Sequence, residues 1–135
     1  MPQSEIFVDT VFVVGLINVR DQHHPAAQRA ADLAAGRRWV TTEPVLFEIG
    51  AMCARSYRAA AARALAELRA SDEVEIVPTT PDRLDRALRL FARYEDKSWS
   101  LADCFSFVVM RERSLEDALT ADEHFQQAGF RAWMQ

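Results

Sequence analysis

The chain has 135 residues, about the length of one domain, and we expect a single domain over residues 1–135. Half of the residues are hydrophobic and 27% are charged, which excludes a disordered, collagen-like or coiled-coil chain. The 16 basic and 20 acidic residues leave a net charge of −4, which argues against a simple nucleic-acid-binding module with a strongly basic surface.

The apolar runs of the chain are short. None approaches the ~20 residues that cross a bilayer, so we expect neither a membrane helix nor a signal peptide. Cys53 and Cys104 each stand inside an apolar run, which favours buried thiols over a disulfide. We therefore expect a cytoplasmic protein.

Predicted strands and helices alternate along the whole chain. In chain order, we expect a strand at 6–8, helices at 11–19 and 26–35, a strand at 39–41, helices at 44–55 and 59–70, a strand at 75–78, helices at 83–94 and 100–110, a strand at 117–120, a helix at 122–128 and a strand at 130–133. Strands separated by helices form parallel crossover units. The sequence therefore predicts an α/β fold with a mostly parallel sheet of four to five strands, covered by helices on both faces.

Four acidic residues stand in unusual surroundings. Asp9 and Asp122 come at or just after predicted strand ends, where parallel sheets collect ligands. Glu48 and Asp103 are the only charges in otherwise apolar helical stretches. A carboxylate among apolar neighbours is unfavourable unless it is paired or binds a cation.

Three of these carboxylates have a local alternative explanation. Asp9 is also a good helix N-cap. Asp122 lies in the segment 120–123, which fits a capping box with Thr120 as the cap. Asp103 follows Ser100 by three residues, so it also fits a first-turn charge on the helix dipole.

Glu48 has no such explanation. It stands one turn into its helix, and Val45, Ala51 and Met52 share its predicted face. A solvated charge is not expected on an apolar face, so Glu48 is the strongest single indication of a site.

Together the four acids follow an ordered set of motifs: Phe7-Val8-Asp9-Thr10, Phe47-Glu48-Ile49-Gly50, Ser100-Leu101-Ala102-Asp103-Cys104 and Leu119-Thr120-Ala121-Asp122-Glu123-His124-Phe125. Their order and spacing resemble the PIN-domain family of metal-dependent ribonucleases, most of all the VapC toxins of bacterial toxin–antitoxin operons. The turn Arg20-Asp21-x-x-His24 is also similar to that family. The resemblance covers essentially the whole chain and implies a three-layer α/β/α PIN-like fold.

The resemblance also implies a metal site. Its catalytic metal ligands would be four carboxylates, those of Asp9, Glu48, Asp103 and Asp122, and the residues that orient these ligands would be Thr10, Ser100 and Thr120. Hard oxygen ligands fit Mg²⁺ or Mn²⁺. The sequence shows no cluster of Cys and His at metal-ligand spacing, which disfavours zinc.

The implied activity is hydrolysis of RNA phosphodiester bonds by a metal-dependent endoribonuclease, the toxin of a VapBC-type pair. The implied partners are an RNA substrate, a VapB-like antitoxin and a second copy of the chain in a homodimer, with no membrane. An apolar groove along helices 44–55 and 58–69 could take an amphipathic antitoxin segment. The alternative is that these apolar side chains are simply core.

Two other functional classes remain open. One is a non-catalytic PIN-like module that binds RNA or protein, against which the presence of all four acids argues. The other is a Mg²⁺-dependent phosphoryl-transfer or receiver-like domain, which needs an acceptor Asp after a middle strand and a late Lys. Here Pro78 follows that strand, and Lys97 stands elsewhere. A dehalogenase-type phosphatase needs Asp-x-Asp, where this chain has Asp9-Thr10-Val11.

All but one of the 16 basic residues are arginine, the exception being Lys97. Six arginines could line an RNA track: Arg20, Arg37, Arg38, Arg55, Arg58 and Arg63. A GC-rich genome would produce the same bias. Trp99, just before the Ser100 motif, could stack on a base, although packing in the core is the favoured interpretation.

Overall fold

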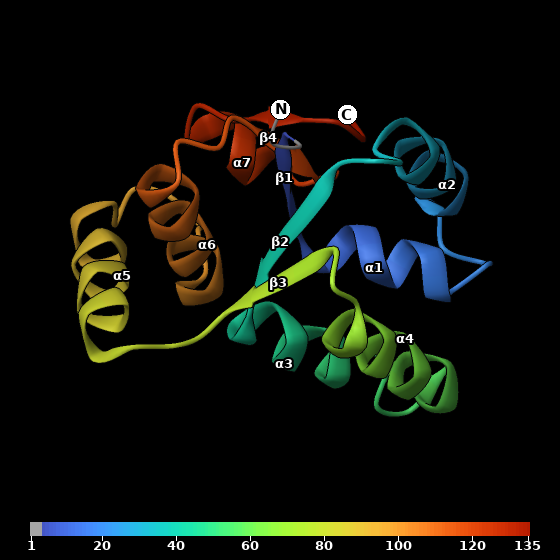
Figure 1. Cartoon of the computed structure of the whole chain (residues 1–135). Helices are drawn as coiled ribbons and strands as arrows, with labels where there is room; N and C mark the ends of the chain where they lie inside the picture. Colours follow the sequence, from blue (N-terminus) through green and yellow to red (C-terminus); the bar gives the residue numbers. More distant parts are fainter. Residues whose placement is uncertain (1–3) are drawn as a thin grey trace.

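The computed structural model describes residues 4–135, which form a five-stranded sheet between two layers of helices (Figure 1). In chain order the elements are β1 (Glu5–Val8), α1 (Thr10–Ile17), α2 (His24–Leu33), β2 (Arg38–Thr42), α3 (Glu43–Met52), α4 (Arg58–Ala70), β3 (Val74–Val77), α5 (Pro81–Arg93), α6 (Leu101–Glu112), β4 (Asp117–Leu119), α7 (Glu123–Gln127) and β5 (Arg131–Ala132). Every strand pair is parallel. The predicted three-layer α/β/α fold is confirmed.

The strand order β3-β2-β1-β4-β5 places a switch point between β1 and β4. From β1 the chain adds β2 and β3 on one side, then returns to add β4 and β5 on the other. Right-handed crossovers then put α1 to α4 on one face and α5 to α7 on the other (Figure 1). Ligands of open parallel sheets bind where the connections diverge, at the carboxyl ends of the strands beside the switch point.

The register between the two central strands positions the residues that follow them. Val8 pairs with Leu119, and the Asp9 N–H donates to the Leu119 carbonyl at 3.2 Å. Asp9 and Thr120, which are 111 positions apart in the chain, are therefore neighbours at the carboxyl edge of the sheet.

The core lies on both faces of β1, whose Ile6, Phe7 and Val8 are fully buried. On the α6 face, the Phe107 ring packs edge-on against Trp99 and Phe125, with centroids 5.1 and 5.0 Å away. An apolar helix such as α6 is stable here because eight of its twelve residues, from Asp103 to Met110, are buried.

The short apolar runs predict buried cysteine thiols and no membrane-spanning helix. Cys53 and Cys104 are free and buried, as expected. Burial, together with the charge of Asp103, raises the pKa of Cys104 to about 11, so its thiol stays protonated. Within residues 4–135, no helix is both long and apolar enough to span a bilayer.

Several predicted boundaries shift for local reasons. The helix predicted at 11–19 ends at Ile17, because Asn18 adopts an extended conformation and starts a turn. The helix predicted at 44–55 ends at Met52, and Tyr57, at a φ of 63°, separates it from α4. A left-handed residue cannot continue an α-helix, so the two predicted helices are separated at Tyr57 as expected, with shifted ends.

Candidate active site

Asp9 occupies the N-cap position of α1, but its side chain makes no capping hydrogen bond. Instead, Oδ2 accepts a hydrogen bond from the Thr120 hydroxyl at 2.7 Å. The residue is 4% exposed, and burial raises the pKa of Asp9 to about 7, against the opposing effect of the Thr120 bond. Helix capping therefore does not explain why this carboxylate is here.

Glu48 is half-buried on α3, and its Oε1 accepts a hydrogen bond from the Thr10 hydroxyl of α1 at 2.6 Å. Burial raises the pKa of Glu48, the Thr10 bond lowers it, and the charges of Asp103 and Asp122 raise it further. The expectation of a buried apolar face around Glu48 was partly wrong, because Met52 on that face is 60% exposed. What singles out Glu48 is the Thr10 bond and the nearby acids.

Asp103 is buried in the first turn of α6. It forms a capping box with Ser100, in which the Ser100 hydroxyl accepts from the Asp103 N–H and Asp103 Oδ2 accepts from the Ser100 N–H, both at 3.0 Å. The first-turn role considered from the sequence is therefore confirmed. It does not exclude a second role, because the carboxylate also faces other acids.

Asp122 is itself the N-cap of α7, and its Oδ1 accepts from the His124 N–H at 2.9 Å. The predicted capping box with Thr120 as the cap is wrong, since the helix begins at Glu123. The Thr120 hydroxyl instead accepts from the Asp122 N–H at 3.0 Å while it donates to Asp9. One buried threonine thus connects two of the four acids.

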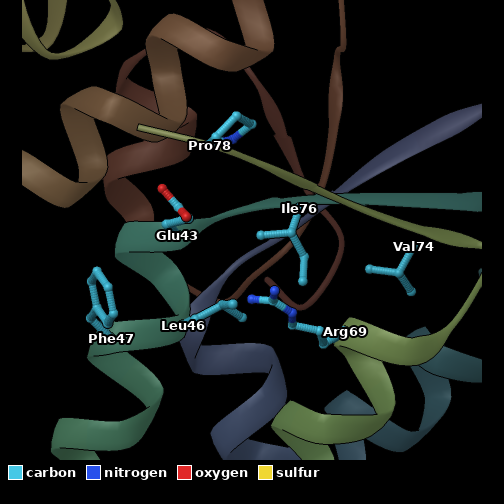
Figure 2. Close-up of a pocket in the computed structure, with 7 residues that line it drawn as sticks. All are labelled: Glu43, Leu46, Phe47, Arg69, Val74, Ile76 and Pro78. Carbon is cyan, nitrogen blue, oxygen red and sulfur yellow. The ribbon is translucent and has the colours of Figure 1, made fainter. Parts of the chain in front are cut away.

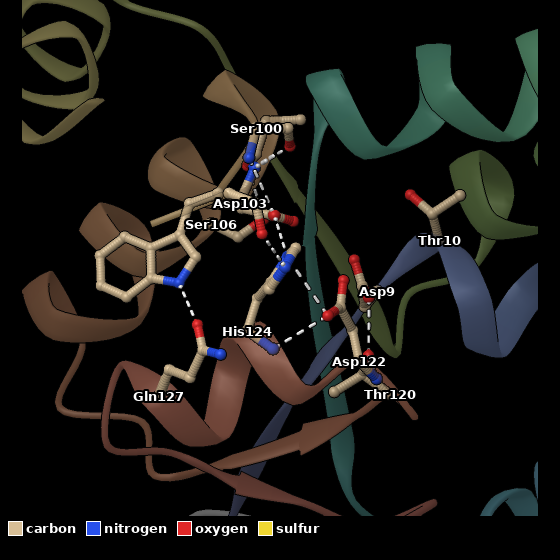
Figure 3. A network of polar contacts seen from close by, with 12 residues as sticks. Asp9, Thr10, Ser100, Asp103, Ser106, Thr120, Asp122, His124 and Gln127 are labelled. Carbon is tan, nitrogen blue, oxygen red and sulfur yellow. Dashed lines mark hydrogen bonds and ion pairs between the residues drawn. The ribbon is translucent and has the colours of Figure 1, made fainter. Parts of the chain in front are cut away.

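His124 is a site residue that the sequence pattern did not single out. Its Nδ1 lies 2.9 Å from Asp103 Oδ2 and 3.3 Å from Asp122 Oδ1 (Figure 3). Its Nε2 lies 3.1 Å from the Ser98 hydroxyl. The available signal was its place two residues after Asp122, inside the last motif.

These side chains come together at the carboxyl edge of the sheet. Asp103, Asp122 and His124 each offer a ligand atom, and the three atoms lie within 4.8 Å of one another. The charges of Asp103 and Glu48 help to raise the pKa of Asp9. Asp9 and Glu48 therefore lie close enough to interact electrostatically with this group. Asp103, Asp122 and His124 offer two carboxylates and one imidazole, and a donor set made mostly of carboxylate oxygens fits Mg²⁺ or Mn²⁺.

Trp99 does not line this site. It is 6% exposed, and its ring N–H donates to Gln127 Oε1 at 2.9 Å. The packing interpretation is confirmed, and base stacking by this residue is excluded by its burial.

The comparisons with known proteins agree with this geometry. The PIN domain family matches residues 6–131, and the chain belongs to the PIN-domain family. Within that family it is VapC-like. It is 35% identical over 127 residues to the 23S rRNA-specific endonuclease VapC20 of two Mycobacterium tuberculosis strains, CDC 1551 / Oshkosh and ATCC 25618 / H37Rv, with 93% of this chain and 95% of the relative covered.

A solved structure is similar over the same extent. The crystal structure of Mycobacterium tuberculosis VapC20, described as a toxin that cleaves the sarcin-ricin loop, matches with a TM-score of 0.85. The two chains share 32% sequence identity, and the match covers 93% of this chain and 96% of that one. The family resemblance inferred from the ordered motifs is therefore confirmed.

Proposed function

We propose that this chain is a Mg²⁺- or Mn²⁺-dependent endoribonuclease, the toxin of a VapBC-type pair, and that it acts on ribosomal RNA in the cytoplasm. The observation that carries the proposal is the meeting of four carboxylates from separate parts of the chain in one partly buried place. Burial and mutual repulsion raise the pKa of both Asp9 and Glu48, so the group is unfavourable without a cation. The VapC20 relatives, which are 23S rRNA endonucleases, support the choice of substrate.

In this proposal the ion is held by four carboxylates, those of Asp9, Glu48, Asp103 and Asp122. When bound, it supplies positive charge against the charge that develops on the scissile phosphate, and it activates the attacking water. The chain itself fixes the ligands in place. The hydroxyls of Thr10 and Thr120 each donate to one carboxylate, and the Ser100 N–H donates to a third.

The test is cleavage of purified 23S rRNA by the purified chain. We expect cleavage with Mn²⁺ or Mg²⁺, its loss in EDTA, and its return when the ion is added back. Cleavage that persists in EDTA would contradict metal dependence. RNA binding without cleavage in the presence of any divalent ion would favour the non-catalytic module. Calorimetric titration with Mn²⁺ measures the metal affinity of the site independently of cleavage.

Replacing Thr10 with valine should weaken Mn²⁺ binding by about 10- to 100-fold, because Glu48 loses the hydroxyl that orients it. The shape of the side chain is kept, so the fold should be unchanged. Calorimetric titration with Mn²⁺ measures the effect, and Thr79→Val at an exposed position is the control. Equal affinities for the two variants would remove Thr10 from the support of the site.

We propose that the antitoxin covers an apolar surface on α3, α4 and β3. Two neighbouring hollows of about 460 and 530 Å³ share Leu46, Phe47 and Arg69 in their walls, and Figure 2 shows the first of them. Phe47 is 74% exposed, so the alternative that these helices carry only core side chains is wrong. An exposed phenylalanine beside a hollow lined mostly by apolar residues, with Glu43 and Arg69 among them, is typical of a protein–protein contact.

Phe47→Glu should therefore weaken the complex with a VapB-like antitoxin by at least about tenfold, because it places a charge in an apolar contact. RNA cleavage by the free variant should remain. Phe91→Glu, on the exposed side of α5, is the control.

We also propose that the chain forms a homodimer. Light scattering on the free chain tests this, and a monomeric mass at micromolar concentration would contradict it.

A further inference from the structure

A basic hollow lies between α5 and α6, on the sheet face opposite α3 and α4. It has a volume of about 430 Å³, and its walls are four arginines around two apolar residues: Arg86, Arg89, Arg93 and Arg111, with Leu90 and Val108. Among the described residues that line it, none is acidic. This is an unusual local charge on a chain whose net charge is −4.

Most of this positive charge is unpaired. Arg86 forms ion pairs with Asp82 at 3.0 Å and with Glu112 at 3.7 Å. Arg89, Arg93 and Arg111 are exposed, and within residues 4–135 none of the three forms a salt bridge or a side-chain hydrogen bond; Arg93 lies over the ring of Tyr94, 5.4 Å from its centroid. Unpaired guanidinium groups around one hollow are suited to bidentate contacts with phosphate.

The Arg93 end of this hollow is the end nearer the start of α6. Arg83 near the start of α5 pairs with Glu112 at the end of α6 at 3.2 Å, so the two helices are antiparallel. The Arg93 end of α5 consequently lies near the start of α6, which carries Asp103. The packing of Tyr94 on Trp99, with ring centroids 5.0 Å apart, joins these two ends.

The length of the hollow fits a chain of phosphates. The rise from Arg86 to Arg93 along α5 is about 10 Å at 1.5 Å per residue. One strand of a nucleic-acid duplex carries a phosphate about every 3.4 Å along its axis, so this stretch spans about three. A single small anion would use only part of it.

We propose that this arginine hollow binds backbone phosphates of the RNA substrate, several nucleotides away from the bond that is cut. The inference rests on the proposed function, and it locates the RNA contact away from two of the arginines suggested by the sequence. Arg37 is engaged with Asp117 at 3.3 Å, and Arg38 donates to the Asp72 carbonyl at 3.0 Å. The RNA therefore crosses the α5–α6 hairpin on its way to the acidic site.

The binding test uses an RNA hairpin with the sarcin-ricin loop sequence and a Glu48→Gln background, in which we expect cleavage to be lost. Arg89→Gln with Arg93→Gln should lower the slope of log Kd against log salt by about 1.4, since each phosphate contact contributes about 0.7 for single-stranded RNA. Between 50 and 200 mM salt, the Kd of the parent should then rise about 7-fold more than that of the variant. Arg29→Glu, on the exposed side of α2, changes the net charge by the same amount and should leave the slope unchanged.

The kinetic test uses chains that retain Glu48. The Arg89→Gln, Arg93→Gln pair should raise KM for the hairpin while kcat stays at the parent value, because the hollow binds RNA away from the reacting phosphate. Gln is as good a helix former as Arg, so the melting temperature should also stay unchanged.

An unchanged slope and KM for the α5 pair would overturn the inference. So would an equal loss in Arg29→Glu, or a lowered slope in Arg55→Gln with Arg63→Gln instead. Failure of the proposed function looks different: the unaltered chain would then not cut RNA with any divalent ion, whatever its salt dependence.

Discussion

Replacing Glu48 with glutamine is expected to lower kcat/KM for RNA cleavage by about a thousandfold, or ~4 kcal/mol of transition-state stabilisation. Glutamine keeps the length of the side chain and the oxygen that accepts the Thr10 hydrogen bond. It removes the negative charge that would hold the ion. Initial rates on 23S rRNA at saturating Mn²⁺ and at limiting Mn²⁺ separate a loss of metal affinity from a loss of rate.

Glu67→Gln is the matched control for this experiment. Glu67 is exposed on α4, and within the described part of the chain it takes part in no salt bridge, so the same change of charge should leave cleavage intact. Calorimetry should show Mn²⁺ binding weakened in the Glu48 variant only. If the Glu48 variant cuts RNA as fast as the parent, Glu48 is not part of the site.

Asp9→Asn is expected to make the metal-free protein more stable above pH 7, by up to about 4 kcal/mol. The pKa of Asp9 is about 7 in the folded chain and 3.8 as the model value for an exposed side chain. Between these values the unfolded chain has released a proton that the folded chain still holds, so the stability of the parent falls as the pH rises from about 4 to about 7. Asparagine has no proton to lose, and the variant escapes this fall.

Urea unfolding in EDTA at pH 4, 5.5 and 8 measures this difference, which should be largest at pH 8 and close to zero at pH 4. Asp85→Asn, exposed on α5, should follow the pH profile of the parent. Added Mn²⁺ should stabilise the parent much more than the Asp9→Asn variant, because the ion needs the carboxylate. A variant no more stable than the parent at pH 8 would contradict the burial of an unfavourable charge at Asp9.

Both effects have one physical origin. A buried carboxylate close to other carboxylates destabilises the fold unless a cation neutralises it. The same arrangement that lowers the stability of the metal-free chain is the one expected to bind the ion. Stability lost at a functional site is a common cost of activity.

The sequence by itself determined the order of the elements and the family. Short apolar runs separated by longer helical stretches are enough to predict parallel crossovers, and these predicted the sheet that the structure has. The four acids were found because each stands at a strand end or inside an apolar helix. Local pattern was also sufficient to place Asp103 in the first turn of its helix, where the structure adds a capping box with Ser100.

Only the tertiary structure decided which groups meet. The pairing of Val8 with Leu119 brings Thr120 to Asp9. The contact between α1 and α3 brings Thr10 to Glu48. The start of α7 places His124 next to Asp103 and Asp122. Likewise, Arg37 and Arg38 are used in internal contacts, whereas Arg89 and Arg93 form no salt bridge with any acidic residue of the described chain. Periodicity along a chain indicates which residues share a face of one element. Contacts between elements depend on strand register and helix packing, and these are determined jointly by residues far apart in the sequence.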